Sequence, residues 1–381
     1  MSAEHMNIPS HAPMHLLFIV GTRPEGIKLA PLITKARADS LQWQVTVCST
    51  GQHDELLRHV FDLFHIVPQY QLEVMRPGQS LSELTGRLLE SLAPVVAAIR
   101  PHVVIVQGDT TSALCGALAA FYEKIPVAHV EAGLRTNDRY APFPEEINRR
   151  LVAQITTWHF APTEQACRNL LAEHVAPEHI FVVGNTVVDA VQEIARSAAN
   201  GSDAQLQYFA RRPFVLITHH RRESFGSPIE RVFHAIRKIA LRHPDVDFIF
   251  PVHPNPNVRQ HAKNLLAGLE NVVLSAPLPY HRFVALMTKA LFLITDSGGI
   301  QEEATAIGKR VLVTRDTTER PEAIEAGYAT LVGTDEERLV KAAEALLTSP
   351  ESFGPTNKTS PFGDGHASQR ILQILSSVLH T

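Results

Sequence analysis

The chain has 381 residues, of which 45% are hydrophobic and 19% are charged, and its formal net charge is −4. This length predicts two domains, each large enough to bury its own core. The acidic balance argues against a nucleic-acid-binding protein, because such proteins usually carry a basic surplus. No apolar run approaches the roughly 20 residues that a membrane-spanning helix needs. We therefore expect a cytoplasmic enzyme with neither a nucleic-acid nor a membrane partner.

The chain contains three cysteines, Cys48, Cys115 and Cys167, and no CxxC pair. An odd number of scattered cysteines is typical of reduced thiols in the cytoplasm and argues against a disulfide framework or a zinc site. The 20 histidines include no HExxH motif. The sequence therefore predicts no metal site.

Short, β-branched apolar runs alternate with longer amphipathic segments along the chain. Continuous apolar strands separated by helices, such as 80–99 and 228–241, predict parallel sheets that are covered on both faces. The first series of expected strands comprises 16–20, 45–48, 103–106, 127–130, 159–161 and 181–183. The second series comprises 214–218, 247–250, 272–274, 291–295, 311–314 and 330–332.

Two such series predict an α/β protein with two doubly wound, Rossmann-like domains. We place the break near Gly184 and Asn185, followed by a polar connector with some helix at 197–212. A last helix, about 367–379, follows a turn-rich stretch at 354–365 and is expected to cross back onto the first domain. The expected domains are residues 1–185 with the C-terminal helix 364–381, and residues 186–363.

Ligands of open parallel sheets bind at the carboxyl ends of the strands, so the turns that follow the strands are informative. The first turn, GTRPEGIK, places Arg23 and Lys28 near a helix N-terminus, where they can attract an anion. It misses the P-loop pattern because the lysine comes one position late and no Ser or Thr follows it. A Walker ATPase is therefore not expected, and the alternative is a plain turn with two surface cations.

Three carboxylates are candidates for general acid and base chemistry in the first domain. Asp109 and Glu131 each follow a predicted strand, and Glu145 begins a helix after a proline. Each has an alternative interpretation: Asp109 as an N-cap, Glu131 as a surface loop residue, and Glu145 as a favourable charge in a first helical turn.

The second domain contains the candidate nucleotide binders. His219 and His220 follow its first strand and should point to opposite faces, so we expect only one of them to act. The turn Ser297–Gly299 opens a helix, and its backbone N–H groups can hold a phosphate, while Glu303 can accept from ribose hydroxyls. The alternatives are a solvated basic loop and an ordinary glycine-rich turn. Carboxylates in one domain and anion binders in the other indicate a nucleotide-sugar enzyme.

The motifs together resemble the non-hydrolysing UDP-N-acetylglucosamine 2-epimerase family. They occur in family order over nearly the whole chain as GTRPEGIK, GDTTS, HVEAGLRT, PEEINR, HRRESF, PVHPNP, DSGGIQEE and DTTERPEA. The resemblance implies a GT-B fold, in which two Rossmann-like domains face a cleft that holds the ligand. It also implies a homodimer that needs neither a metal nor a nicotinamide cofactor.

The resemblance further implies that the enzyme eliminates UDP to give 2-acetamidoglucal and adds it back to give UDP-ManNAc, which supplies surface polysaccharide synthesis. It assigns catalytic roles to four residues: Asp109, Glu131, Glu145 and His220. We expect Glu131 and Asp109 to form the acid/base set, with Glu145 supporting or sharing. It implies contacts with UDP or the sugar for another eight: Arg23, Lys28, Phe283, Ser297, Gly298, Gly299, Glu303 and Arg320.

Many family members also bind UDP-GlcNAc at a regulatory site. Gln52, Arg221 and His253 match contact types seen there, whereas Gly78 stands where some relatives have an arginine. His219 stands where relatives often have a small residue. Effector binding is therefore a hypothesis for this chain.

Four alternatives remain open from the sequence. A related epimerase could act on another UDP-N-acetyl sugar, such as a UDP-diacetamido-uronic acid, and a hydrolysing relative would release free ManNAc. A GT-B glycosyltransferase would share the fold but would not need so many first-domain carboxylates. A non-catalytic nucleotide-sugar sensor would not need those carboxylates either, although fold alone does not exclude it.

Overall fold

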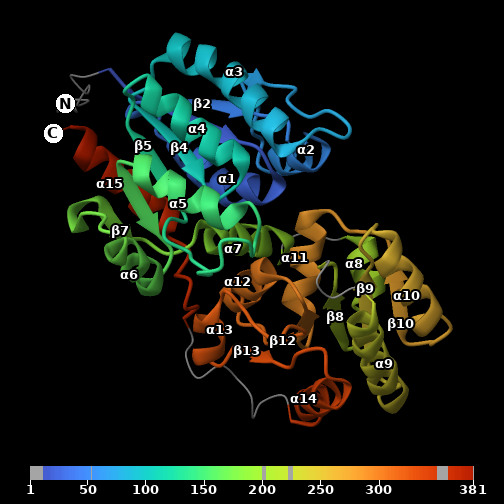
Figure 1. The fold of residues 1–381 in the computed structure, drawn as a ribbon. Helices are drawn as coiled ribbons and strands as arrows, with labels where there is room; N and C mark the ends of the chain where they lie inside the picture. The colour runs from blue at the N-terminus through green and yellow to red at the C-terminus, as the bar shows by residue number, and fades with distance from the viewer. Residues whose placement is uncertain (1–11, 53, 200–202, 222–225, 350–358, 381) are drawn as a thin grey trace, which may run out of the picture. The chain divides into compact units, whose positions relative to one another are not determined.

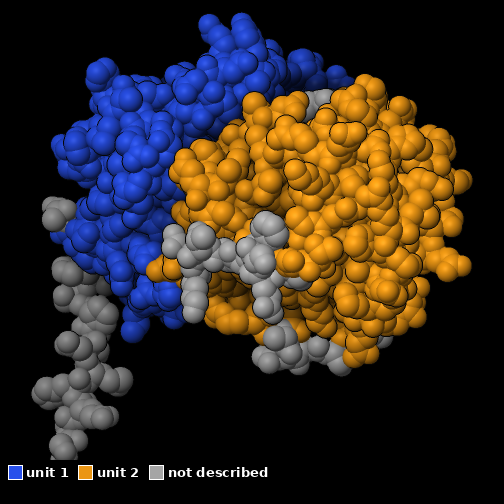
Figure 2. All heavy atoms as spheres, turned by 90° about the horizontal axis from the view of Figure 1, so that it is seen from below, with its two compact units in different colours: residues 1–186, 366–381 blue, residues 187–365 orange. Residues whose placement is uncertain are grey.

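The computed structural model describes residues 12–52, 54–199, 203–221, 226–349 and 359–380. The chain divides into two compact units, Met1–Thr186 with His366–Thr381, and Val187–Gly365 (Figure 2). Four predicted features lie wholly or partly outside the described residues: the polar N-terminus, part of the connector at 197–212, the end of the HRRESF motif, and the start of the turn-rich stretch before the last helix.

The first unit is built on a seven-stranded parallel sheet in the order β3-β2-β1-β4-β5-β6-β7 (Figure 1). Its central strand is completely buried from Leu16 to Val20, as expected for a parallel sheet with helices on both faces. The strands are β1 (Met14–Val20), β2 (Trp43–Ser49), β3 (Tyr70–Gln71), β4 (Val103–Gln107), β5 (Val127–Val130), β6 (Trp158–Ala161) and β7 (Ile180–Val182).

The helices of this unit pack in two sets. Helix α4 contacts α3 and α5, and α1 contacts α2 and the C-terminal helix α15 (Figure 1). The helices are α1 (Arg23–Ala38), α2 (Asp54–Leu63), α3 (Leu81–Ile99), α4 (Thr111–Tyr122), α5 (Glu145–Ile155), α6 (Glu164–Ala172), the 3₁₀ turn η1 (Pro177–His179) and α15 (Ala367–Leu379).

The second unit repeats the design with a six-stranded parallel sheet in the order β10-β9-β8-β11-β12-β13. The strands are β8 (Phe214–Thr218), β9 (Asp247–Pro251), β10 (Val272–Ser275), β11 (Leu293–Thr295), β12 (Val311–Val313) and β13 (Ala329–Leu331). The helices are α7 (Thr186–Ala199), α8 (Ala204–Phe209), α9 (Ser227–Arg242), α10 (Pro256–Leu266), α11 (Tyr280–Lys289), α12 (Gly298–Ala306), α13 (Pro321–Glu325) and α14 (Glu336–Thr348). Two Rossmann-like units in one chain confirm the predicted α/β architecture of GT-B type.

All twelve predicted strands are present, within two residues of their expected ends. The edge strand β3 was not predicted, because a two-residue pairing with Cys48 and Ser49 is too short to leave a periodic pattern. The expected connector is more helical than predicted, since α7 and α8 occupy most of its described part.

The C-terminal helix α15 belongs to the first unit, although the whole second unit separates it from the rest of that unit in sequence. Ile371 and Leu375 are completely buried on its apolar face. Polar contacts fix its two ends: Arg370 Nη1 donates to the Val183 carbonyl at 3.2 Å, and Gln42 Nε2 donates to Ser376 Oγ at 2.5 Å. Among the described residues, no helix has the length and apolar character needed to cross a bilayer.

The strand order marks where each unit should bind ligands. The order reverses between β1 and β4 in the first unit and between β8 and β11 in the second. Open α/β sheets bind ligands beside the carboxyl ends of strands at such a reversal. The turns after these four strands, which contain most of the predicted site residues, therefore form the candidate site of each unit.

Candidate active site

A buried glutamate joins the two turns at the strand reversal of the first unit. Glu25 lies in the first turn of α1 and is 1% exposed. Its Oε2 accepts from the backbone N–H of Thr22 at 2.6 Å, and its Oε1 accepts from Thr110 Oγ1 at 2.8 Å. Thr110 in turn caps α4 by accepting from the Ala113 N–H. The turn after β1 is thus fixed to the turn after β4.

The same two turns approach each other closely at Gly21. A Cβ atom built on this residue would lie 2.2 Å from Ser112 Oγ and 2.9 Å from Thr50 Oγ1. Glycine is therefore required by the packing of β1 against the start of α4. Ser112 Oγ also donates to Gln52 Oε1 at 2.7 Å, so the predicted effector residue lies beside this turn.

The burial of Glu25 predicts a pH-dependent stability. Burial raises its pKa from 4.5 to about 7, although hydrogen bonds from Thr22 and Thr110 oppose the shift. Between these values the folded state binds more protons than the unfolded state, so stability falls as pH rises. Relative to the non-titrating variant Glu25→Gln, the wild type should lose about 3 kcal/mol of unfolding free energy between about pH 4 and about pH 8.

Urea denaturation followed by tryptophan fluorescence measures this difference. Both tryptophans of the chain, Trp43 and Trp158, lie in the first unit, so their emission reports its unfolding. A constant difference between the wild type and the variant across this pH range would contradict the assignment.

Glu131 is fixed by three donors at the end of β5. Its carboxylate is paired with the Lys28 ammonium and accepts from Gln107 Nε2 at 3.0 Å and Asn185 Nδ2 at 2.7 Å. The side chains of Lys28 and Glu131 are 12% and 8% exposed. Glu131 also has a φ of +65°, a backbone conformation that is uncommon outside glycine and recurs at functional sites. A carboxylate with these partners is held in one place.

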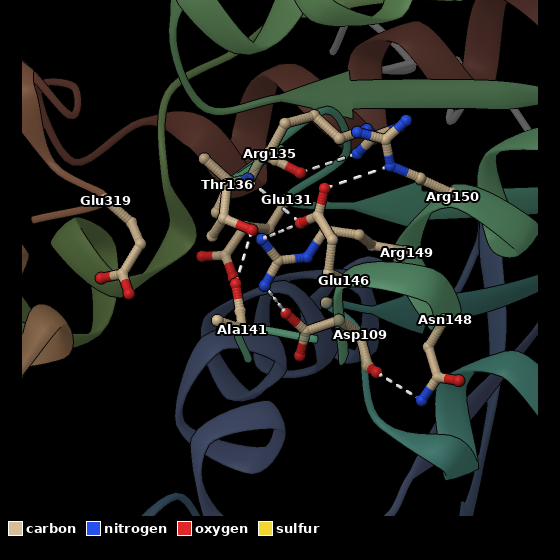
Figure 3. A network of polar contacts seen from close by, with 12 residues as sticks. Asp109, Glu131, Arg135, Thr136, Ala141, Glu146, Asn148, Arg149, Arg150 and Glu319 are labelled. Atoms are coloured by element: carbon tan, nitrogen blue, oxygen red, sulfur yellow. Dashed lines mark hydrogen bonds and ion pairs between the residues drawn. The ribbon is translucent and has the colours of Figure 1, made fainter. Parts of the chain in front are cut away.

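Asp109 belongs to an ion-pair chain that ends in a buried carboxylate (Figure 3). The Arg149 guanidinium pairs with Asp109 and, at 3.4 Å, with Glu146. Glu146 is completely buried and accepts from the backbone N–H groups of Thr136 at 3.1 Å and Asn137 at 3.3 Å. Arg150, which lies one helical turn after Glu146 in α5, also pairs with Glu146 (Figure 3). Glu146 therefore holds both α5 and the loop after β5.

Glu145, beside Glu146 in sequence, has a different environment. It is partly buried, and burial raises its pKa, with the negative charge of Asp109 raising it further. Glu145 therefore keeps its proton to a higher pH than an ordinary glutamate. Carboxyl groups whose environments differ in this way are typical of acid/base pairs.

Sequence reasoning missed three members of this site: Gln107, Arg149 and Asn185. Gln107 is the last residue of β4 and directly follows the predicted strand 103–106. Asp109 and Glu131 were predicted because they, too, come just after predicted strands. Arg149 follows Glu146 at helical spacing, which also could have suggested the pair. Asn185 follows β7 closely, but the sequence pattern indicates a domain break at this position. Among the described residues, no group of three or more His, Cys, Asp or Glu side chains is arranged to hold a metal.

In the second unit, Asp296 joins the turns after β8 and β11. It is completely buried, and its Oδ2 accepts from the backbone N–H groups of His220 and Arg221, both at 2.8 Å. His220 is 40% exposed and its Nδ1 lies 3.3 Å from Asp296 Oδ1. His219 is buried and packs edge-on against Phe233, and its Nδ1 also lies 3.3 Å from Asp296, at Oδ2. The two histidines differ in exposure, but both rings approach Asp296, so their orientation to opposite faces stays a prediction.

The turn after β11 has room next to its glycines. Ser297 caps α12 by accepting from the Ile300 N–H. A Cβ atom on Gly298 would lie 3.6 Å from Glu319 Oε2, and one on Gly299 would lie 3.8 Å from Ser297 Oγ, which are ordinary contacts. The packing of the unit therefore does not itself require these glycines. Close approach of a ligand to the backbone would explain them.

The remaining predicted contacts differ in their surroundings. Arg320 is 12% exposed and its guanidinium pairs with the buried Glu302, so its charge is already neutralised within the protein. Glu303 and Phe283 are 8% and 9% exposed. Arg23, the remaining predicted cation of the first unit, is partly exposed at the start of α1. A contact of any of these side chains with UDP stays a prediction.

Two predicted effector residues lie beside His220. The His253 ring stacks on His220 with centroids 5.6 Å apart, and burial lowers the pKa of His253. Arg221 lies 3.8 Å from Glu319. Burial alone would raise the Glu319 pKa, but Arg315 and Arg221 lower it to about 2. Effector binding by these residues stays a prediction.

Comparisons with known proteins agree on one family. The family model described as UDP-N-acetylglucosamine 2-epimerase matches residues 35–376. A relative from Escherichia coli strain K12, named UDP-N-acetylglucosamine 2-epimerase, is 47% identical over 372 residues, covering 96% of this chain and 99% of the relative.

Solved structures give the same result. The UDP-GlcNAc 2-epimerase of Neisseria meningitidis, bound to UDP-GlcNAc, is 42% identical with a TM-score of 0.89, covering 96% of this chain and 100% of that chain. The Methanocaldococcus jannaschii UDP-GlcNAc 2-epimerase, in complex with UDP-GlcNAc and UDP, is 36% identical with a TM-score of 0.80 and the same coverage. With two Rossmann-like units, and with carboxylates at the strand ends of the first, the chain belongs to the UDP-N-acetylglucosamine 2-epimerase family.

Proposed function

We propose that this protein is a non-hydrolysing epimerase that interconverts UDP-GlcNAc and UDP-ManNAc. The observation that carries the proposal is the set of carboxylates at one edge of the first sheet, each held by its own partners: Glu131 by Lys28, Asp109 by Arg149, and Glu145 by its partly buried position. Family membership supplies the substrate class, because relatives with nearly full coverage are named for this activity.

The chemistry explains the need for several carboxylates. The hydrogen at C2 of the sugar is not acidic, because no carbonyl lies next to that carbon in the ring. We propose that the C1–O bond breaks with loss of the C2 proton, which gives UDP and 2-acetamidoglucal. Protonation from the opposite face with re-addition of UDP then gives the manno isomer. Two faces need two proton-handling positions.

The three carboxylates differ in ways that suit this scheme. We propose that Glu131, held in place by three donors, accepts a proton from one face. Glu145, whose pKa is raised, and Asp109 handle the proton on the other face. These roles refine the expectation that Glu131 and Asp109 form the acid/base set and give Glu145 an equal part.

UDP is a tolerable leaving group when its charge is stabilised. We propose that the backbone of Ser297–Gly299 and His220 hold the diphosphate, and that Arg23 and Lys28 add positive charge. The room beside Gly298 and Gly299 supports the first of these contacts. Glu303 would accept from the ribose hydroxyls and Phe283 would lie close to the uracil. Arg320, paired with Glu302, would act by positioning its loop.

Three further statements rest on family membership. We propose that the protein is a homodimer, that it works in the cytoplasm, and that its product enters surface polysaccharide synthesis. Each is testable apart from the catalytic activity, by light scattering, by cell fractionation, and by loss of a ManNAc-containing polymer in a deletion strain.

Incubation with UDP-GlcNAc in deuterated water tests the proposed reaction. We expect UDP-ManNAc that carries deuterium at C2, detected by NMR, because the C2 proton is lost in the elimination and a proton derived from the solvent is added from the opposite face. Free ManNAc would instead indicate a hydrolysing enzyme. Unchanged UDP-GlcNAc that remains bound would indicate a sensor. Turnover of a UDP-diacetamido-uronic acid in preference to UDP-GlcNAc would indicate a different sugar.

A further inference from the structure

We propose that Asp296 is a positioning residue for His220, holding its imidazole with the proton on Nδ1 and leaving Nε2 to face the substrate. The catalytic part of this inference rests on the proposed function, in which His220 acts at the diphosphate. The structural part concerns one carboxylate and one imidazole of the second unit, and it can be tested in the ligand-free protein.

Backbone hydrogen bonds fix the Asp296 carboxylate. Oδ2 accepts two N–H groups, from His220 and Arg221, each at 2.8 Å. This arrangement leaves Oδ1 on the His220 side, 3.3 Å from Nδ1 of the ring. Because Asp296 is completely buried, its charge is not screened by water. A small ring rotation converts the 3.3 Å contact into an N–H···O hydrogen bond.

The other groups that face the His220 ring do not compete for this proton. His219, on the same segment, is buried, and its Nδ1 lies 3.3 Å from Asp296 Oδ2, the oxygen that already accepts the two backbone N–H groups. Burial lowers the pKa of His219, and the charge of Asp296 opposes this shift. His253, from the turn after β9, stacks on the ring, and burial together with the charge of His220 lowers its pKa. Arg221 lies near Glu319 in the turn after β12. Asp296 is therefore the carboxylate that sets the state of the His220 ring.

This state suits a group that assists departure of UDP. When the C1–O bond breaks, its electron pair moves to the β-phosphate oxygen, while the C2 proton moves to a carboxylate of the first unit. An imidazolium with Nδ1–H toward Asp296 presents Nε2–H to that oxygen and can donate its proton. Asp296 stabilises the cation without taking a proton itself, as the aspartate of a catalytic triad does.

The substitution Asp296→Asn separates positioning from packing. The two backbone N–H donors require an oxygen, so the amide oxygen stays with them and the amide N–H₂ turns toward His220. A donor then faces Nδ1, which becomes an acceptor, and the proton moves to Nε2. We expect kcat to fall about 10²-fold or more while KM changes less than about threefold.

NMR of the ligand-free protein labelled with ¹⁵N-histidine reports the tautomer of the His220 ring. This tautomer should not change if Asp296 only stabilises the fold. The His220 signals are identified by their loss in His220→Gln. We expect the Nδ1–H tautomer at about pH 8 in the wild type and the Nε2–H tautomer in Asp296→Asn. Asp335→Asn is the matched control, because it makes the same exchange at an exposed N-cap of the same unit. It should change neither kcat nor the tautomer.

Two results would overturn the proposal. One is an Nε2–H tautomer in the wild type, a result that does not depend on the folding of Asp296→Asn. The other is an unchanged tautomer or an unchanged kcat in a folded Asp296→Asn protein. A wild-type protein that shows the expected tautomer but does not epimerise UDP-GlcNAc would refute the proposed function and leave the positioning of His220 standing.

Discussion

Glu131→Gln is expected to lower kcat for epimerisation about 10³-fold or more, because it removes the proposed base for the C2 proton. The amide cannot accept a proton at neutral pH. Its N–H₂ group would also face donors, since Lys28, Gln107 and Asn185 all donate to this carboxylate. Exchange of the C2 proton with deuterated water should disappear together with epimerisation.

The affinity of Glu131→Gln for UDP distinguishes the loss of a catalytic group from damage to the binding site. We expect UDP affinity, measured by calorimetry, to change little, because the proposed UDP contacts lie mainly in the second unit. Glu164→Gln is the control for charge removal, since it changes an exposed glutamate in the first turn of α6. It should retain full activity. Epimerisation at more than about a tenth of the wild-type rate in Glu131→Gln would show that another group is the base.

Glu146→Ala is expected to destabilise the first unit by about 3–5 kcal/mol, the usual cost of breaking a buried ion pair. The substitution leaves Arg149 and Arg150 without a shared partner and two backbone N–H groups, of Thr136 and Asn137, without an acceptor. Urea unfolding followed by tryptophan fluorescence measures the loss, since both tryptophans report on this unit.

Activity should fall as well at temperatures where the variant remains folded, because Arg149 positions Asp109. The matched control is Glu90→Ala, an exposed glutamate in α3 of the same unit. It should change the free energy of unfolding by no more than about 0.5 kcal/mol. A loss of less than about 1 kcal/mol in Glu146→Ala would contradict the structural role of the network.

The sequence by itself determined the strands apart from the short edge strand β3, the two Rossmann-like units, and the turns that carry the candidate site. A strand of a parallel sheet is buried on both faces, so runs such as Leu16–Val20 and Phe214–Thr218 are continuously apolar and easy to find. The polar residues directly after such runs lie at the ligand-binding edge by geometry alone. This rule placed Asp109, Glu131 and Ser297 without any tertiary information.

Partnerships between distant residues were decided only by the tertiary structure. Glu145 and Glu146 are adjacent and chemically identical, and both suited the first turn of a helix. Successive helical side chains point about 100° apart, so one lies near Asp109 while the other is buried between arginines.

Glu25 and Asp296 show the same limit. Each is buried and joins two turns that lie more than 70 residues apart in sequence. Local patterns record the periodicity of a segment but not the identity of its neighbour in another segment. The sequence therefore indicated where the candidate site lies, and the packing of the turns specified which carboxylates are fixed, which have a raised pKa and which support the others.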